Sequence, residues 1–174
     1  MADFININEP LSYLDVQRSD SAAEFGCGTA EFALALARKV DKGKVYALDI
    51  LEEKLSVLKH KIALHGPHNI KMIVCDLEAP NGSTLKNNSL QVVLIPNLLF
   101  GVENKHAIIE EAKRVLKAGG QLLVIDWLTS TSWGPKEGLV KPEEVKQLAE
   151  MSGFSLKREF AVGDYHYGLL FLKT

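Results

Sequence analysis

The chain has 174 residues, 47% of them hydrophobic, two cysteines and a formal net charge of −2 at pH 7. This length predicts one domain with a substantial core, and the balanced charge lacks the basic field on which binding to nucleic acid depends, so we expect no nucleic-acid partner. No stretch reaches the roughly 20 apolar residues of a membrane-spanning helix, and so few cysteines predict no disulfide framework, so we expect a soluble, cytoplasmic protein without a membrane partner.

Short apolar segments alternate with amphipathic segments along most of the chain. Several of the apolar segments are continuous runs, which are typical of parallel strands covered on both faces. The amphipathic segments repeat apolar residues at the spacing of a helix that packs one face on a sheet. The expected strands are Ser21–Phe25, Lys44–Asp49, Ile70–Cys75, Leu90–Ile95 and Gln121–Ile125, and the expected helices between them are Ala30–Val40, Glu52–His65 and Lys105–Leu116.

The last part of the chain departs from this alternation. A helix is expected from Pro142, and two strands, Phe154–Phe160 and Tyr165–Leu172, then follow with only four residues between them. So short a connection permits an antiparallel hairpin and excludes a crossover helix. We therefore predict an α/β fold with a mostly parallel sheet of seven strands and an antiparallel C-terminal strand. Residues 21–174 are expected to form one domain behind a short N-terminal cap segment, residues 1–20.

The first expected strand ends in a glycine-rich turn, Glu24-Phe25-Gly26-Cys27-Gly28-Thr29, just before the first helix. Glycine lets the backbone turn sharply there and lets a ligand approach where a side chain would block it. The free N–H groups at the start of the next helix favour a carboxylate or a phosphate. The turn therefore predicts a site for a nucleotide-type cofactor.

Polar residues also end or follow the next three strands. Asp49 ends the second strand about 20 residues beyond the turn, where a carboxylate can accept hydrogen bonds from the two hydroxyl groups of a ribose. Asp76, after the third strand, can accept one from an adenine amino group, although an aspartate there also commonly starts a turn. Asn97 follows the fourth strand. Because ligands of open α/β sheets bind beyond the carboxyl ends of the strands, we expect one crevice there.

From about Ala22 onwards the chain resembles the class I S-adenosylmethionine-dependent methyltransferases, and among them the small quinone-biosynthesis-like branch called type 11. Glu24–Thr29 looks like the glycine motif of that family, Asp49 matches its strand-end acid, Asp76-Leu77 its adenine-side pair, and Leu116–Gly120 the turn before its fifth strand. The resemblance implies a Rossmann-like, doubly wound domain with S-adenosylmethionine as cofactor. The implied donor contacts are Glu24, Gly26, Cys27, Gly28, Asp49, Ile50, Asp76, Leu77 and Asn97.

The competing cofactor is NAD. A dinucleotide fingerprint needs a third glycine at the place that Glu31 occupies, and an acid there would repel a pyrophosphate. The methyl donor has no phosphate, so Glu31 is compatible with it, and the C-terminal hairpin also favours the methyl donor. Ala30 stands where the family commonly has another glycine, and we expect its methyl group near the methionine end of the donor.

The resemblance implies methyl transfer to a small-molecule acceptor by in-line displacement, in which the enzyme mainly aligns the acceptor and excludes water. The sequence does not assign a catalytic residue, and the candidates are Asp126, Tyr165 and His166. Asp126 is equally typical of a capped turn, and His166 of a strand-end histidine held by a hydrogen bond. Trp127 and Trp133 can line a substrate pocket or merely cover the edge of the sheet.

Two other functions fit the sequence. The cap segment is short, so the chain can be a donor-binding module that a homodimer or a partner protein completes. An uncapped crevice can also admit a protein or RNA acceptor. No metal site is expected, because His65 and His68 flank Gly66-Pro67 and cannot share one rigid helical turn.

Overall fold

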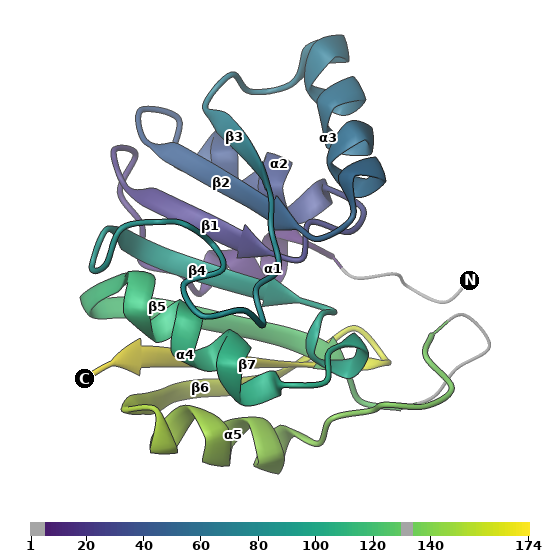
Figure 1. Ribbon diagram of the computed structural model, residues 1–174, viewed down its shortest axis with the longest axis vertical. Coiled ribbons are helices and arrows are strands. Elements are labelled where there is room, and N and C mark those ends of the chain that lie inside the picture. Colours follow the sequence, from purple (N-terminus) through teal and green to yellow (C-terminus); the bar gives the residue numbers. More distant parts are fainter. Residues whose placement is uncertain (1–5, 130–133) are drawn as a thin grey trace.

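The computed structural model describes residues 6–129 and 134–174, so residues 1–5 of the predicted cap segment and Trp133 lie outside the described part. The strands are β1 (Ser21–Phe25), β2 (Lys44–Asp49), β3 (Ile70–Val74), β4 (Leu90–Pro96), β5 (Leu116–Trp127), β6 (Phe154–Val162) and β7 (His166–Lys173). The helices are α1 (Asn8–Ser12), α2 (Glu31–Lys39), α3 (Glu52–His65), α4 (Lys105–Val115) and α5 (Pro142–Met151), with a short 3-10 helix, η1 (Leu99–Gly101). Figure 1 shows one sheet with helices on both of its faces.

The seven described strands lie in the order β3-β2-β1-β4-β5-β7-β6. The pairs among β1 to β5 are parallel, while β7 lies antiparallel between β5 and β6. The predicted mostly parallel, Rossmann-like sheet with an antiparallel C-terminal strand is therefore confirmed. The chain winds outward in opposite directions from β1 and β4, and such a reversal opens a crevice outside the carboxyl ends of the strands.

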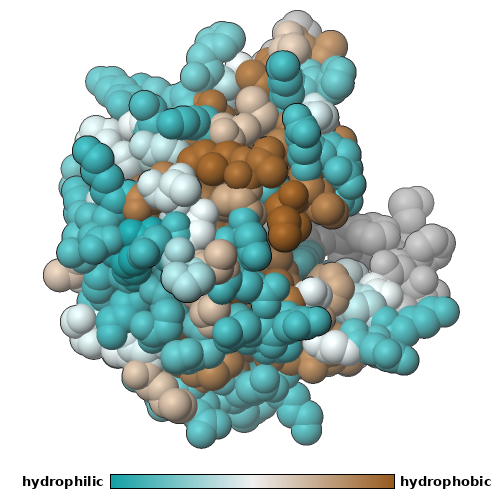
Figure 2. Space-filling view, in the orientation of Figure 1, coloured by the Kyte–Doolittle hydropathy of each residue, from teal (hydrophilic) through white to brown (hydrophobic). Residues whose placement is uncertain are grey.

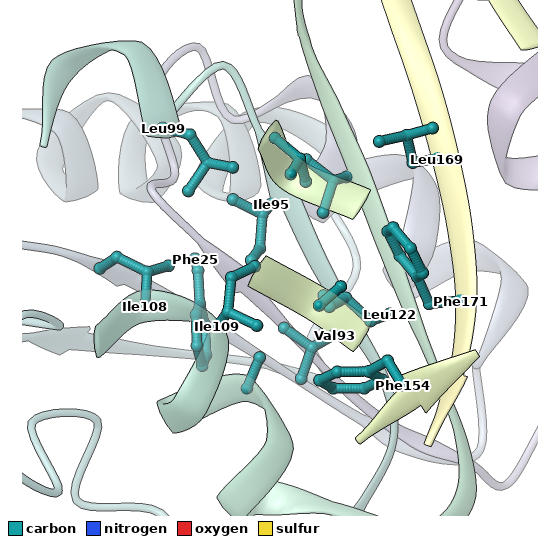
Figure 3. Close-up of a cluster of buried hydrophobic side chains, with 14 of the residues drawn as sticks. Phe25, Val93, Ile95, Leu99, Ile108, Ile109, Leu122, Phe154, Leu169 and Phe171 are labelled. Carbon is teal, nitrogen blue, oxygen red and sulfur yellow. The ribbon is translucent and has the colours of Figure 1, made fainter. Parts of the chain in front are cut away.

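Two groups of helices cover the sheet through separate sets of apolar side chains. On one face, α1 and α2 contribute Leu11 and Phe32 to a buried cluster. On the other face, in front in Figure 1, α4 and α5 pack against the sheet. Figure 3 shows side chains of this second cluster, among them Phe25 of β1, Ile109 of α4 and Phe171 of β7. Burial on both faces explains the continuous apolar runs of the strands and holds their carboxyl ends in place.

Some elements differ from the prediction. The structure adds α1 and η1, whose five and three residues are too few to produce a helical period in the sequence. β5 begins at Leu116, which already pairs with Leu90, and regular pairing resumes only where Gln121 meets Val92. The turn expected at Leu116–Gly120 is therefore an irregular stretch within β5. Its first residue already pairs with β4, and the residues between Leu116 and Gln121 form a bulge in the pairing.

The described part of the cap segment lies on the α2 side of the sheet. Leu11 and Leu14 are buried in the cluster that includes Phe32. The Gln121 side chain joins this segment to β5, since it accepts a hydrogen bond from the Asp15 amide at 3.0 Å and donates one to the Asp15 carbonyl at 2.6 Å. These contacts attach the described part of the segment firmly to the domain.

A buried ionic network organises residues 75–89, the described connection between β3 and β4, which contains no helix. Glu111 of α4 accepts hydrogen bonds from the Ser83 amide at 3.0 Å and from two nitrogens of Arg114 at 2.7 Å each. Arg114 also donates to the Leu85 carbonyl at 2.8 Å. Burial opposes the charge of Glu111, but the hydrogen bonds from Arg114 and Ser83 outweigh it, so the pKa of Glu111 is lowered. Charged hydrogen bonds thus hold this connection to α4.

Replacing Glu111 with Gln should lower the free energy of unfolding by roughly 1–3 kcal/mol at neutral pH, because an amide nitrogen cannot accept the bonds that Arg114 and Ser83 donate. The folded-state pKa of Glu111 is lowered, so its charge stabilises the wild type above the unfolded-state pKa of about 4.3. This advantage is lost as the pH falls through the folded-state pKa. Urea unfolding from about pH 7 to pH 3 measures both effects.

Glu110→Gln is the matched control, because the Glu110 side chain lies on the same helix and is 45% exposed. It should change the stability by less than about 0.5 kcal/mol. Equal losses in the two variants at neutral pH, or a loss in Glu111→Gln that persists unchanged at low pH, would contradict the role given to the Glu111 carboxylate.

Candidate functional site

The glycine turn between β1 and α2 folds back over the end of β2. The amides of Gly26 and Cys27 both donate to the Leu48 carbonyl, at 2.9 and 3.1 Å. Gly26 has φ of 80°, and a Cβ there would lie 3.0 Å from the Leu98 side chain. Gly28 also has positive φ, 46°. Both positions therefore favour glycine, one of them also because Leu98 packs so closely.

Ala30 takes the left-handed conformation that its glycine-like position requires. Its φ is 72°, and it directly precedes the first residue of α2. The residue is completely buried, in a cluster with Ala33 and Leu58. The methyl group of Ala30 therefore lies in the core between α2 and α3, and its expected place near the methionine end of the donor stays a prediction.

A lysine from α3 holds the end of the same turn. Lys61 Nζ donates to the Thr29 carbonyl at 2.9 Å and forms an ion pair with Glu31. Glu31 is therefore not the free charge that we expected to repel a pyrophosphate. The discrimination between cofactors must depend on the acids that line the crevice itself.

Asp49, at the end of β2, is held between the glycine turn and the start of α3. Its Oδ2 accepts a hydrogen bond from the Gly28 amide at 3.3 Å, and its Oδ1 accepts one from the Leu51 amide at 3.0 Å. The residue is 9% exposed. Each carboxylate oxygen can accept more than one hydrogen bond, so this carboxylate is oriented and still able to bind hydroxyl groups.

One crevice outside β2 and β3 brings together five of the nine predicted donor contacts: Gly26, Asp49, Ile50, Asp76 and Leu77. Figure 2 shows apolar residues gathered beside β3 and toward the start of α3, where Ile50 is 61% exposed. Asp76 also starts a turn, since its Oδ1 accepts a hydrogen bond from the amide two residues later at 2.9 Å. The crevice is therefore both acidic and apolar.

Sequence reasoning missed the remaining lining residues. Cys75 and Leu98 each lie next to a predicted site residue, so their position just beyond a strand was a usable signal. Nothing in the local sequence pattern marks Glu78, Val102 and Ile108. The first lies in the connection after β3, and the other two lie just before α4 and within it. These five residues are Cys75, Glu78, Leu98, Val102 and Ile108.

Three buried side-chain atoms at the carboxyl edge of the sheet have no hydrogen-bond partner among the described residues. They are Glu24 Oε2, Asn97 Oδ1 and His166 Nε2. Burial raises the pKa of Glu24 well above its usual range, the Ala33 amide opposes this shift, and the nearby charge of Asp49 adds to it. Among residues 6–129 and 134–174 the one further atom of this kind, Ser152 Oγ, lies at the end of α5. Buried polar atoms are normally paired, so their concentration at one edge points to a ligand there.

Asp126 is completely buried at the end of β5 and holds the connection that follows β4. Its carboxylate accepts hydrogen bonds from the Leu99 amide at 2.9 Å and from the Trp127 amide at 2.8 Å. Burial raises the pKa of Asp126 to about 6, and the amides of Trp127, Leu99 and Phe100 oppose this shift. The bond from Leu99 holds the start of η1 in the connection after β4, and neither bond comes from the turn that follows β5.

The other two candidates for a catalytic residue, Tyr165 and His166, lie at the C-terminal hairpin. Tyr165 is in the turn, and its carbonyl accepts a hydrogen bond from the Leu128 amide at 2.7 Å. His166 is 7% exposed and lies against Trp127, with 4.1 Å between the ring centroids and 40° between the planes. Burial lowers the pKa of His166 to about 4. The hairpin turn lies at the carboxyl edge of the sheet, because Trp127 at the end of β5 pairs with His166.

Within residues 6–129 and 134–174 there is no group of three or more histidine, cysteine or acidic side chains that could hold a metal ion. The same ranges contain no helix that is long and apolar enough to cross a membrane. Both cysteines are free, and burial raises the pKa of Cys27 to about 12 and that of Cys75 to about 11. Neither thiol is therefore a nucleophilic thiolate at neutral pH.

The fold is shared with solved methyltransferase structures. A S-adenosylmethionine-dependent methyltransferase from Aquifex aeolicus matches with a TM-score of 0.87 over 98% of this chain and 90% of that chain, at 24% sequence identity. The sheet order, the glycine turn and this likeness together define the Rossmann-like fold of that class of enzymes.

Sequence comparison then shows the family. The family described as "Methyltransferase domain" matches residues 18–164. A demethylmenaquinone methyltransferase from Geobacillus stearothermophilus is 32% identical over 126 residues, which cover 70% of this chain and 51% of that protein. Another, from Bacillus mycoides, is 31% identical over 134 residues and covers 76% and 55%. The chain belongs to the methyltransferase-domain family, as the resemblance predicted, and spans about half the length of the curated relatives it matches.

Ala30→Gly and Ala33→Gly form a matched pair that tests the backbone of the site. Both alanines are completely buried, but only Ala30 has positive φ. Glycine should relieve the left-handed strain at position 30, roughly 1–2 kcal/mol, whereas within a helix it costs about 1 kcal/mol. Thermal unfolding should therefore find Ala30→Gly more stable than Ala33→Gly by roughly 2 kcal/mol. If both variants lose equal stability, Ala30 is not strained.

Proposed function

We propose that this chain binds S-adenosylmethionine along the carboxyl edge of the sheet and transfers its methyl group to a small-molecule acceptor. The observation that carries the proposal is the pair of buried, unpartnered oxygens, Glu24 Oε2 and Asn97 Oδ1, beside the glycine turn and Asp49. The family and the fold imply the same cofactor.

The amino-acid end of the donor fits the two unpartnered oxygens. A buried acceptor without a partner costs about 1–3 kcal/mol, which a bound N–H donor recovers. The α-ammonium group of S-adenosylmethionine has three such donors and a positive charge. A positive group near Glu24 would also lower the raised pKa of its carboxyl and favour the ionised form. Glu24 and Asn97 are therefore the residues that would hold this end.

The nucleoside end fits the acidic crevice. Asp49 would accept hydrogen bonds from the ribose hydroxyls and Asp76 from the adenine amino group, while Ile50 and Leu77 offer apolar surface to the base. The lining residues, all in the described part of the chain, include Glu78 as a third acid and no lysine or arginine. Three carboxylates would repel the pyrophosphate of NAD, so the crevice favours a donor without phosphates.

When bound, S-adenosylmethionine supplies a methyl group on a positively charged sulfur. The acceptor would attack the methyl carbon in line with the carbon–sulfur bond, and the sulfur would be the leaving group. The residues of this chain would contribute by positioning and by excluding water. Asp126 supports that role, because it fixes η1 through the Leu99 amide, next to the Leu98 side chain of the crevice. No proton transfer is assigned to Asp126, since its carboxylate is completely buried and, unlike that of Asp49, does not line the crevice.

A quinone-like acceptor has the support of the relatives, two of which are named as demethylmenaquinone methyltransferases. Because this chain spans only about half of their length, the activity of the whole protein belongs to the proposal. The cytoplasmic location, the homodimer and the partner that completes the cap segment stay predictions.

Asp49→Asn should weaken the binding of S-adenosylhomocysteine by roughly 1.5–3 kcal/mol, about 10- to 150-fold, because it removes a charge-assisted contact to the ribose. Isothermal titration calorimetry measures the affinity. Asp41→Asn is the control, since Asp41 is an exposed acid that pairs with Arg18 before β2 and should not affect the affinity. Equal affinities of Asp49→Asn and the wild type would show that the ribose lies elsewhere.

The activity is tested with labelled S-adenosylmethionine and three kinds of acceptor: a naphthohydroquinone, a peptide and an RNA. We expect transfer to the hydroquinone alone. Binding of the donor without any transfer would favour the binding module, and transfer to peptide or RNA would show a macromolecular acceptor. Binding of NAD with no binding of S-adenosylmethionine would contradict the proposal itself.

A further inference from the structure

The strand pairing sets how far His166 lies from the proposed donor site. The Asn97 amide donates to the Ile125 carbonyl at 2.7 Å, so Asn97 lies directly beside the end of β5. On the other side of β5, Trp127 pairs with His166 of β7. β5 thus lies between the backbones of Asn97 and His166. The two backbones are therefore two inter-strand spacings apart, which is roughly 10 Å. This span suits an acceptor with one or two rings.

Trp127 and His166 also share a face of the sheet with Glu24. Side chains alternate along a strand, so Trp127 lies on the side of Ile125, and His166 on the side of Leu170. Both of these neighbours belong to the cluster that α1 and α2 cover. Glu24 lies on the same side, two residues after a member of that cluster. The donor-side carboxyl and the Trp127–His166 pair therefore lie at the carboxyl end of one face.

His166 lies against an aromatic ring, and its pKa is shifted by burial alone. Burial is the only cause that lowers the pKa of His166, to about 4, and no charged group contributes to the shift. The imidazole is therefore neutral at neutral pH, with one N–H donor and one lone pair. Among the described residues, no charged group shifts the pKa of His166, so an ionic acceptor would gain no counter-charge from them. A hydroxyl group can instead hydrogen-bond to Nε2, which has no partner among the described residues.

We propose that Trp127 and His166 form the acceptor subsite, in which Nε2 of His166 accepts a hydrogen bond from a hydroxyl group of a flat aromatic acceptor and Trp127 lies along its ring. The inference rests on the proposed function, because the donor must lie beside Asn97 and Glu24. His166 orients the acceptor and takes no proton. In the transfer, the sulfur–methyl bond breaks and a bond forms from that carbon to the attacking atom of the acceptor, whose proton is lost to the solvent when the methylated product leaves the site.

Three probes that differ in one substituent test the subsite: 2-naphthol, 2-methoxynaphthalene and 2-naphthoate. Each is titrated by calorimetry into the protein saturated with S-adenosylhomocysteine. We expect 2-naphthol to bind at least tenfold more tightly than 2-methoxynaphthalene, because only the naphthol has a hydroxyl proton to donate. We expect 2-naphthoate to bind most weakly, because the subsite offers no positive charge.

Three substitutions separate the hydrogen bond from the shape of the site. His166→Met removes the hydrogen-bonding atom at similar length and should abolish the preference for 2-naphthol, while His166→Gln places an amide near Nε2 and should keep most of it. Trp127→Leu should weaken both neutral probes together. S-Adenosylhomocysteine affinity, measured for each variant, should stay at the wild-type value, and thermal unfolding shows that each variant is folded at the temperature of the titration.

The outcomes distinguish the two proposals. Normal binding of S-adenosylhomocysteine with no preference for 2-naphthol in the wild type, or with the preference intact in His166→Met, overturns the acceptor subsite alone. Absence of S-adenosylhomocysteine binding in the wild type overturns the proposed function, and the subsite with it. Tightest binding by 2-naphthoate would also overturn the subsite, because it would require a cation beside His166.

Discussion

Parallel strands that end together bring polar groups to one edge of a sheet, and the rest of this structure depends on how those groups find partners. Some are satisfied within the chain: Asp126 accepts hydrogen bonds from Leu99 and Trp127, and Asp49 from Gly28 and Leu51. These bonds fix the connections around the crevice. Others stay buried without a partner among the described residues, and they mark where a ligand fits. The same edge thus combines rigid support with binding capacity.

The two ends of the proposed site come from different parts of the chain. The donor end uses residues that end or follow β1 to β4, where each connection begins with a turn. The acceptor end depends on β7, which inserts antiparallel between β5 and β6 and brings His166 beside Trp127. An antiparallel strand starts where its parallel neighbours end, so the first residue of β7 reaches the same edge as the donor site. Variation at the hairpin can therefore alter the acceptor without disturbing the glycine turn.

Much of the fold and half of the lining of the crevice could be predicted from the sequence, because local rules govern them. β1, β2 and α3 have the predicted bounds, and Asn104 caps α4, as its position before the helix indicates, by accepting a hydrogen bond from the Ala107 amide. The glycines of the turn and the acids of the crevice end or directly follow strands, so the predicted strand bounds also place them at the carboxyl edge of the sheet. Glu31 was less predictable: its partner, Lys61, is 30 residues away, and only packing of α3 beside the turn brings the two together.

The sequence by itself determined the order of strands and helices, the glycine turn and the acids that end or follow strands, since hydrophobic periodicity and turn chemistry act over a few residues. Only the tertiary structure decided which buried polar atoms have no hydrogen-bond partner among the described residues. Asp126 and His166 look alike in the sequence as polar residues at strand ends, yet one accepts hydrogen bonds from backbone amides and the other has a buried nitrogen without a partner among the described residues. That difference depends on which distant segments pack around each side chain, and burial then sets the charge that each group can carry.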